Sequence, residues 1–285
     1  MHQLTHNDIR NYAQSRLCEH PRWNALVEET SASSSQSLIN DTLFKSNGVF
    51  LWVFLVTRLL REGLSNDDSI ADLRARLSSF PTDLKDFFRH ILESVDSFYH
   101  EKTARTLMIT LEAEEPLYLE IYLYHDYDFE DESFPFKEPT EAISTDLEKL
   151  AKAFSSVSRR INGRCKGLLE RSGDKMDFLQ RTVYDHLRTA EMTEFLKERV
   201  RTSFSPSAAI LRAWVAWIKR SNFPKGSVNI TKRNLLKENP SFVERMRQCL
   251  IRACLTDTES EASSAVTTSL LDNMEVGLRQ MIRRG

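Results

Sequence analysis

The residues in this sequence that could most readily do chemistry are the carboxylates of the run Asp126–Glu132, which reads Asp-Tyr-Asp-Phe-Glu-Asp-Glu. Alternating carboxylates are the ligands of helix–loop–helix calcium sites, which also need a glycine at the sixth loop position and a glutamate at the twelfth. Counted from Asp126, those positions hold Asp131 and Lys137. The run therefore does not match a calcium loop. We expect the segment 126–139, which also holds two prolines, to be an exposed acidic loop.

Motifs for nucleotide, nucleophilic and zinc chemistry are missing from the sequence. No glycine is followed by lysine, so the phosphate-binding pattern G-x-x-x-x-G-K-[ST] does not occur, and neither do G-x-G-x-x-G and G-x-S-x-G. His90 and His186 do not begin an H-E-x-x-H pair. We therefore expect a protein that is not an enzyme, with no catalytic residue, no metal ligand and no cofactor.

The spacing of the cysteines and the hydropathy of the sequence indicate the cellular compartment in which we expect the protein. The sequence holds no cysteine pair with the two-residue spacing of a zinc knuckle, and we expect free thiols in a reducing compartment. The N-terminal segment is polar, and the longest apolar run, Val49–Val56, is eight residues long. A helix that spans a bilayer needs roughly 20 apolar residues. We expect a cytoplasmic protein with no membrane partner. The cysteines are Cys18, Cys165, Cys249 and Cys254.

Composition and apolar spacing predict a mainly helical fold. The 285 residues include only 8 Gly and 8 Pro, fewer than a turn-rich β fold would need. Apolar residues recur with helical period along most of the chain. The expected helices cover residues 5–17, 36–61, 69–80, 84–95, 104–111, 143–163, 181–188, 210–218, 242–255 and 264–282. A Ser-rich loop is expected at 31–37, and 117–124 is either helical or extended.

The apolar period changes after Gly163. Short apolar runs at Arg164–Glu170 and Met176–Gln180 are separated by Arg-Ser-Gly-Asp-Lys, which predicts a β-hairpin with Gly173 in its loop. From Ser97 onward the expected order is helix, short helix, long helix, hairpin, helix. That is the order of a winged helix, a helix-turn-helix variant.

The predicted fold class is therefore mainly α: a helical bundle, then a winged-helix-like subdomain with one small β-hairpin, then a helical, solenoid-like tail. The corresponding domains are 1–96, 97–190 and 191–285. In the tail, Trp217 lies off the apolar face that contains Trp214. Trp217 is therefore either an exposed interaction residue or packed against the following helix.

Basic residues on the long helix raise the alternative of nucleic-acid binding, which needs a row of phosphate contacts. These residues are spread around the helix, and Asp146 and Glu148 dilute the charge at its start. Nucleic acid is therefore a disfavoured partner. The net charge is −12 over residues 1–142 and +10 over residues 143–285. Two halves whose charges are simply solvated would also show this asymmetry. The basic residues are Lys149, Lys152, Arg159, Arg160 and Arg164, with Lys166 just beyond.

Three parts of the sequence stand out together: Ser46–Val53, Phe80–Leu92, and the pair Arg160–Glu170 with Asp177–Leu187. Together they resemble segments of fungal NACHT-type NTPases. Ser46–Val53 is similar to the "GVFLWV" helix near the end of the NACHT module, and Phe80–Leu92 to the "LP-x-DL-x-x-x-Y-x-x-IL" stretch that follows it. Arg160–Glu170 and Asp177–Leu187 resemble "R-x-x-RCKGLLE" and "V-x-FLHRTV-x-DFL" of an uncharacterised domain placed C-terminal to the module. The order and spacing of the segments, covering roughly 4–190, carry the resemblance.

The resemblance implies the C-terminal part of a STAND-class switch protein, related in logic to NOD-like receptors, including the uncharacterised helical or winged-helix domain after the NACHT module. In that family the nucleotide lies between a P-loop subdomain, a helical subdomain and a winged helix that holds the closed, ADP-bound state. This chain would supply the second and third parts and lack the P-loop half, as a truncated relative or as part of a longer protein. Gln180 stands where the family motif has a histidine that is expected to face the nucleotide. Glutamine can donate a hydrogen bond but cannot become a cation.

The function that we expect is that of a non-catalytic regulatory or protein-interaction module of a NACHT-type signalling switch. Its partners would be proteins, among them a NACHT P-loop module in cis or in trans. Two alternatives stay open: a winged-helix protein that binds nucleic acid, and a plain helical scaffold. The sequence does not indicate an oligomeric state.

Overall fold

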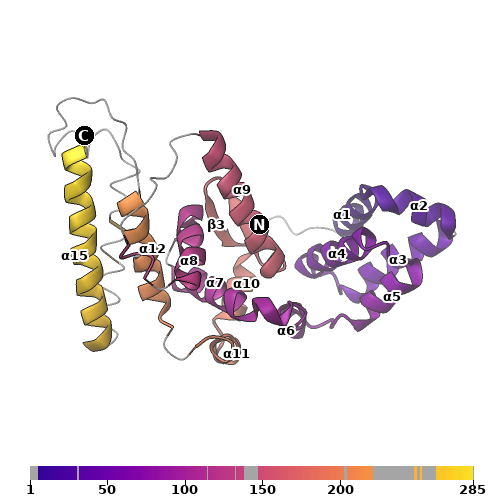
Figure 1. The fold of residues 1–285 in the computed structure, drawn as a ribbon. Helices are drawn as coiled ribbons and strands as arrows, with labels where there is room; N and C mark the ends of the chain where they lie inside the picture. Colours follow the sequence, from indigo (N-terminus) through magenta and orange to yellow (C-terminus); the bar gives the residue numbers. More distant parts are fainter. Residues whose placement is uncertain are drawn as a thin grey trace. The chain divides into compact units, whose positions relative to one another are not determined.

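The computed structural model describes residues 6–30, 32–113, 115–131, 133–137, 147–201, 204–220, 247–248, 251 and 261–284. The described chain is mainly helical with one small three-stranded antiparallel sheet, which confirms the predicted fold class (Figure 1). It divides into two compact units, Met1–Ser94 and Val95–Gly285. The predicted helix at 242–255 lies largely outside the described residues, as do Cys249 and Cys254.

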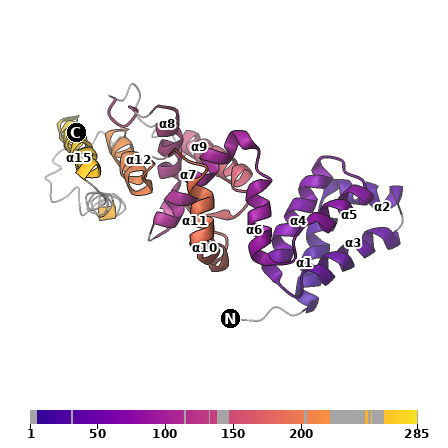
Figure 2. The same ribbon diagram turned by 90° about the horizontal axis from the view of Figure 1, so that it is seen from below.

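The first unit is a bundle of helices around α4 (Figure 2). Because α4 is apolar on nearly every side, neighbouring helices must cover it, and α1, α2, α3 and α5 all contact it. Trp52 at its start is 1% exposed, and its indole N–H donates a hydrogen bond of 2.7 Å to the Pro81 carbonyl. The elements are α1 (His6–Cys18), α2 (Pro21–Glu29), α3 (Ala32–Lys45), α4 (Phe50–Ser65), α5 (Ile70–Ser79) and α6 (Leu84–Glu93).

The sequence-based prediction of a loop at 31–37 followed by one helix over 36–61 is wrong. Helix α3 already begins at Ala32, and the chain turns between α3 and α4. Asn47 and Gly48 make this turn with φ values of 49° and 80°, in the left-handed region that ends helices. Lys45 fixes the end of α3, since its ammonium donates to three carbonyls at the end of α5 and just beyond it.

The second unit combines helices with the predicted hairpin, which is confirmed. Strands β2 and β3 pair with Leu169 opposite Phe178, and Gly173 in their turn has φ 63°. A short strand, β1, which starts the segment left open as helical or extended, pairs with β3, so the sheet order is β1-β3-β2. The elements are η1 (Ser97–Tyr99), α7 (His100–Glu112), β1 (Leu117–Tyr118), α8 (Leu119–Glu130), α9 (Leu147–Arg164), β2 (Leu169–Ser172), β3 (Lys175–Phe178), α10 (Arg181–Leu187), α11 (Ala190–Lys197), α12 (Pro206–Arg220) and α15 (Glu261–Arg284).

Helix α12 is the centre of the second unit's C-terminal part. It packs against α7 and α8, and α15 runs beside it (Figure 1). Because more than one side of α12 is covered, Trp217 is only 8% exposed and meets Trp214 edge-on at 5.6 Å between ring centroids. The hypothesis of an exposed Trp217 is therefore wrong.

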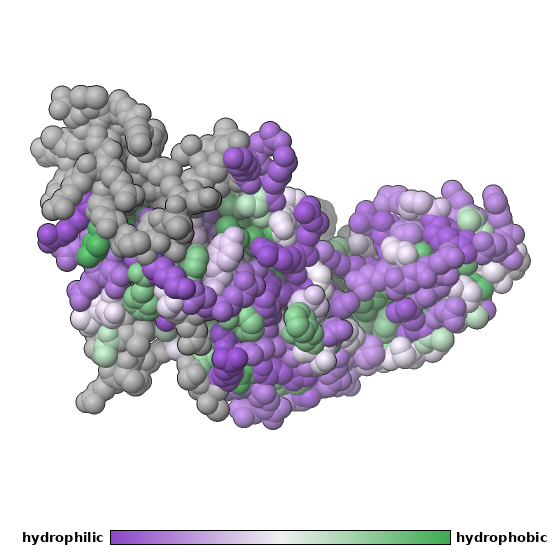
Figure 3. Space-filling view, in the orientation of Figure 1, coloured by the Kyte–Doolittle hydropathy of each residue, from purple (hydrophilic) through white to green (hydrophobic). Residues whose placement is uncertain are grey.

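The visible surface of the described residues is largely hydrophilic. Apolar residues show as small separated areas between polar ones (Figure 3). The large apolar side chains that remain exposed include Phe44 on α3 and Phe98 on η1. Among the helices of the described residues, none is long and apolar enough to cross a membrane.

Candidate interaction site

The acidic segment after residue 126 is not an exposed loop at its start, as the sequence suggested. Residues 126–130 are the last turns of α8, where Asp126 and Asp128 are buried. Helix α8 contacts α9 on one side and α12 on another. Its carboxylates therefore lie inside the unit, where a charge must have a partner.

Two arginines from distant parts of the sequence neutralise these carboxylates. Arg164, at the end of α9, donates to Asp126 at 2.7 Å, and both side chains are less than 10% exposed. Arg212 on α12 makes a bidentate contact with Asp128, with N–O distances of 2.5 to 3.0 Å. The two ion pairs join α9 and α12 to α8.

His125 lies beside these ion pairs and is fully enclosed. Burial, together with the nearby guanidinium groups of Arg105, Arg164 and Arg212, lowers its pKa to about 3. The imidazole is therefore neutral at physiological pH. Its ring centroid lies 6.0 Å from that of Phe204, which also packs against the Arg105 guanidinium at 4.7 Å.

The basic row predicted on α9 is divided by this arrangement. Arg164 points inside, and Arg160 lies 3.6 Å from Asp126 while half-exposed. Lys152 pairs with Glu148 on the surface at 2.7 Å. Arg159 is exposed and donates to the Ser155 hydroxyl at 2.9 Å. The helix therefore does not present all of its predicted basic residues to a ligand.

Gln180, the position singled out by the family motif, is exposed directly before α10. Its backbone is extended, with φ −152° and ψ 155°, and its side chain makes no capping hydrogen bond to the helix. Cys165, in the same unit, is buried, and burial raises the pKa of its thiol to about 12. In the described part of the chain, no three His, Cys, Asp or Glu side chains gather as metal ligands.

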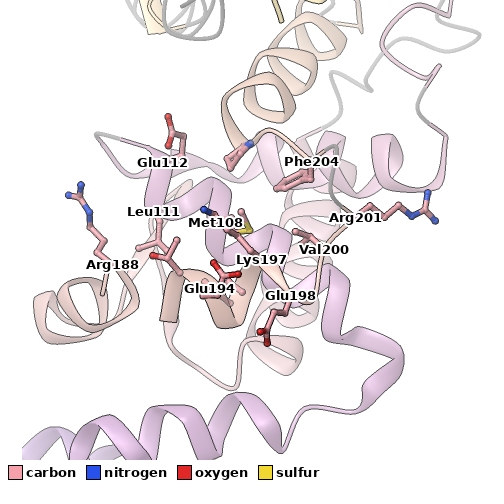
Figure 4. A pocket seen from close by; sticks show the side chains of 13 residues that line it. Met108, Leu111, Glu112, Arg188, Glu194, Lys197, Glu198, Val200, Arg201 and Phe204 are labelled. Atoms are coloured by element: carbon pink, nitrogen blue, oxygen red, sulfur yellow. The ribbon is translucent and has the colours of Figure 1, made fainter. Parts of the chain in front are cut away.

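A groove, which we call the α11 groove, lies between α7, α11 and the start of α12 (Figure 4). Its volume is about 820 Å³, within the range of small-molecule pockets. Arg188 and Arg201 lie at its two ends, with Glu194 and Glu198 between them (Figure 4). The apolar lining residues are Met108, Leu111, Leu196, Val200, Phe204 and Pro206, and the charged ones are Glu112, Arg188, Glu194, Lys197, Glu198 and Arg201.

The α11 groove could not be predicted from the sequence. Its walls come from segments about 80 residues apart, and no motif connects Met108 with Val200. Each helix taken alone has an ordinary apolar stripe that predicts burial. Only the packing of α11 on α7 shows that part of the α7 stripe, at Met108 and Leu111, stays partly open to solvent while the large apolar residues of α11 are buried.

Comparison with known proteins identifies one family. Residues 94–228 match the family model described as "Domain of unknown function (DUF7791)". No curated protein matches the chain, and no solved structure does. Residues 94–228 are therefore a DUF7791 domain, a member of an uncharacterised family.

Proposed function

We propose that the chain is a non-catalytic regulatory module of a NACHT-type signalling switch and acts through contacts with other proteins. The observation that carries the proposal is the element order within the DUF7791 domain: α7, β1, α8, α9, β2, β3. This is the order of a winged helix. It includes the strand β1, which pairs with β3. The sequence pattern did not distinguish this strand from a helix.

The segments that resemble the NACHT family include turns and helix ends of the structure, which supports the resemblance. Gly48 ends the turn before α4, and Asp83 caps α6 by accepting from the Lys85 amide at 2.8 Å. Lys166 and Gly167 make the turn between α9 and β2 with φ values of 49° and 77°. Residues at such positions are constrained by backbone geometry, so a motif there indicates a shared local fold.

The nucleic-acid alternative has less support because the buried pair of Arg164 with Asp126 removes one cation from the α9 row. Phosphate binding depends on exposed lysines and arginines. Exposed Lys152 and Arg159 remain on α9. The plain scaffold alternative differs from the proposal only in lacking a response to a nucleotide-loaded partner.

The proposal predicts that the chain alone binds neither Mg-ADP nor Mg-ATP. The sequence contains no P-loop, and Gln180 by itself offers one neutral amide. Calorimetric titration of each nucleotide into the full chain is the test. Heat that fits micromolar binding, or phosphate release above that of a buffer control, would show that the chain carries a nucleotide site of its own.

A further inference from the structure

We infer that the side of α12 that α15 covers is a docking face for an amphipathic helix of a partner protein, and that α15 occupies this face as an intramolecular ligand which the partner's helix displaces. The inference rests on the proposed function, since it names the kind of protein contact that the module makes. It is carried by the position of α15 beyond the DUF7791 domain, by the spacing of its buried side chains and by the way in which it is held.

Helix α15 lies outside the family domain and packs on it mainly through one helix. The DUF7791 match ends at residue 228, whereas α15 begins at Glu261. Of the described elements, α12 is the only one with which α15 makes an extensive contact, and α12 lies between α15 and α8 (Figure 1, Figure 2). Among the described residues, the domain therefore presents α12 as the seat on which α15 lies.

The buried side chains of α15 have the spacing of a helix that binds to another protein. Thr267, Leu270 and Met274 are at most 7% exposed. Leu271 is half-buried, while Ser269 is exposed. Counted from Thr267, the covered positions are i, i+3, i+4 and i+7, the anchor pattern by which an amphipathic helix fits an apolar surface. A partner's helix with the same pattern would fit the same face of α12.

Polar contacts fix α12 to the domain, whereas the contact of α15 includes an unsatisfied polar group. Ser207 on α12 donates a hydrogen bond of 2.7 Å to Glu112 on α7. Arg212 on α12 makes the bidentate contact with Asp128 on α8. On α15 the Thr267 hydroxyl is buried and has no hydrogen-bond partner among the described residues, which weakens the contact. Helix α15 should therefore leave α12 while α12 stays in place.

Hydrogen–deuterium exchange of the full chain tests whether α15 opens by itself. The backbone amides of α15 should exchange at least about tenfold faster than those of α12, because a helix that leaves its neighbour opens as a separate unit. Equal exchange in the two helices would show that α15 opens only together with the domain and would overturn the inference. This measurement needs no substitution, so it does not depend on the folding of a variant.

A competition experiment tests the docking face, with a fluorescein-labelled peptide of residues 261–284 as the probe. Leu270→Asp in the full chain places a charge at a fully buried position of α15 and should release the helix. The peptide should then bind this variant at least about tenfold more tightly than the unchanged chain, in which the tethered α15 competes at a high effective concentration. The matched control Ser269→Asp adds the same charge on the exposed side of α15 and should leave peptide binding unchanged.

Fluorescence anisotropy measures peptide binding, and circular dichroism checks that the Leu270→Asp chain is folded. The same affinity for the unchanged chain and the Leu270→Asp chain, or no binding to either, would refute the docking face. If the peptide binds as predicted while a NACHT nucleotide-binding module binds neither chain, the docking face stands and the proposed function fails. If the module binds and the peptide does not, the docking face is refuted and the proposed function stands.

Discussion

Replacing Trp52 by alanine is expected to lower the free energy of unfolding of the first unit by about 3–5 kcal/mol, the range for a large buried aromatic side chain. The indole is 1% exposed and packs on Phe87 with ring centroids 5.7 Å apart. Its N–H also fixes the Pro81 carbonyl, so the variant loses a hydrogen bond between α4 and the turn before α6. Urea unfolding of the full chain, followed by circular dichroism and tryptophan fluorescence, measures the effect.

The matched control for Trp52→Ala is Phe44→Ala. Phe44 lies on the neighbouring helix α3 and is 85% exposed, so its removal should change the free energy of unfolding by less than about 0.5 kcal/mol. Because a domain is stable by only about 5–15 kcal/mol, the Trp52 variant should also express poorly. Similar effects of the two substitutions would contradict the central position of α4 in the first unit.

Breaking the buried ion pair between Asp126 and Arg164 is the second change with a large expected effect. Asp126→Leu leaves the Arg164 guanidinium buried without its counter-charge, and such losses cost about 3–5 kcal/mol. Arg164→Met leaves the carboxylate with only the half-exposed Arg160, 3.6 Å away, so its cost should be smaller. The double variant removes both charges and should recover most of the loss, because an apolar pair of similar volume is often as stable as a buried ion pair.

A double-mutant cycle on the second unit measures this coupling by urea unfolding of the four proteins. The exposed pair of Glu148 with Lys152 is the control, since both side chains are about three-quarters exposed and a Glu148→Ala change should cost at most about 0.5 kcal/mol. Additive effects of Asp126→Leu and Arg164→Met would show that the two charges do not depend on each other.

The helices and the hairpin could be predicted from the sequence because their signals are local. The stripe from Leu84 to Leu92 repeats every three to four residues, and the structure places α6 there. Gly173 between two short apolar runs predicted the β2–β3 turn. The break between α3 and α4 was missed because its signal is only the pair Asn47 and Gly48, next to a strong apolar run.

The site features could not be predicted because they depend on partners far along the chain. Asp126 is buried only because Arg164, 38 residues later, reaches it, and Asp128 depends on Arg212, 84 residues later. Seen in sequence alone, an acidic run with nearby prolines is typical of a surface loop. The sequence left Trp217 either exposed or packed for the same reason, since only the fold shows that the helix α12 that holds it is covered from more than one side.

The most direct measurement of the proposed function is a calorimetric titration of the full chain into a recombinant fungal-type NACHT nucleotide-binding module, loaded first with Mg-ADP and then with Mg-ATP. We predict binding to the ADP-loaded module that is at least about tenfold tighter than binding to the ATP-loaded one, because a switch needs a partner with different affinities for its two states. The chain with Gln180→Ala should bind more weakly to the ADP-loaded form alone. No binding in either state, or the same affinity in both, would contradict the assignment of the chain as a regulatory part of such a switch.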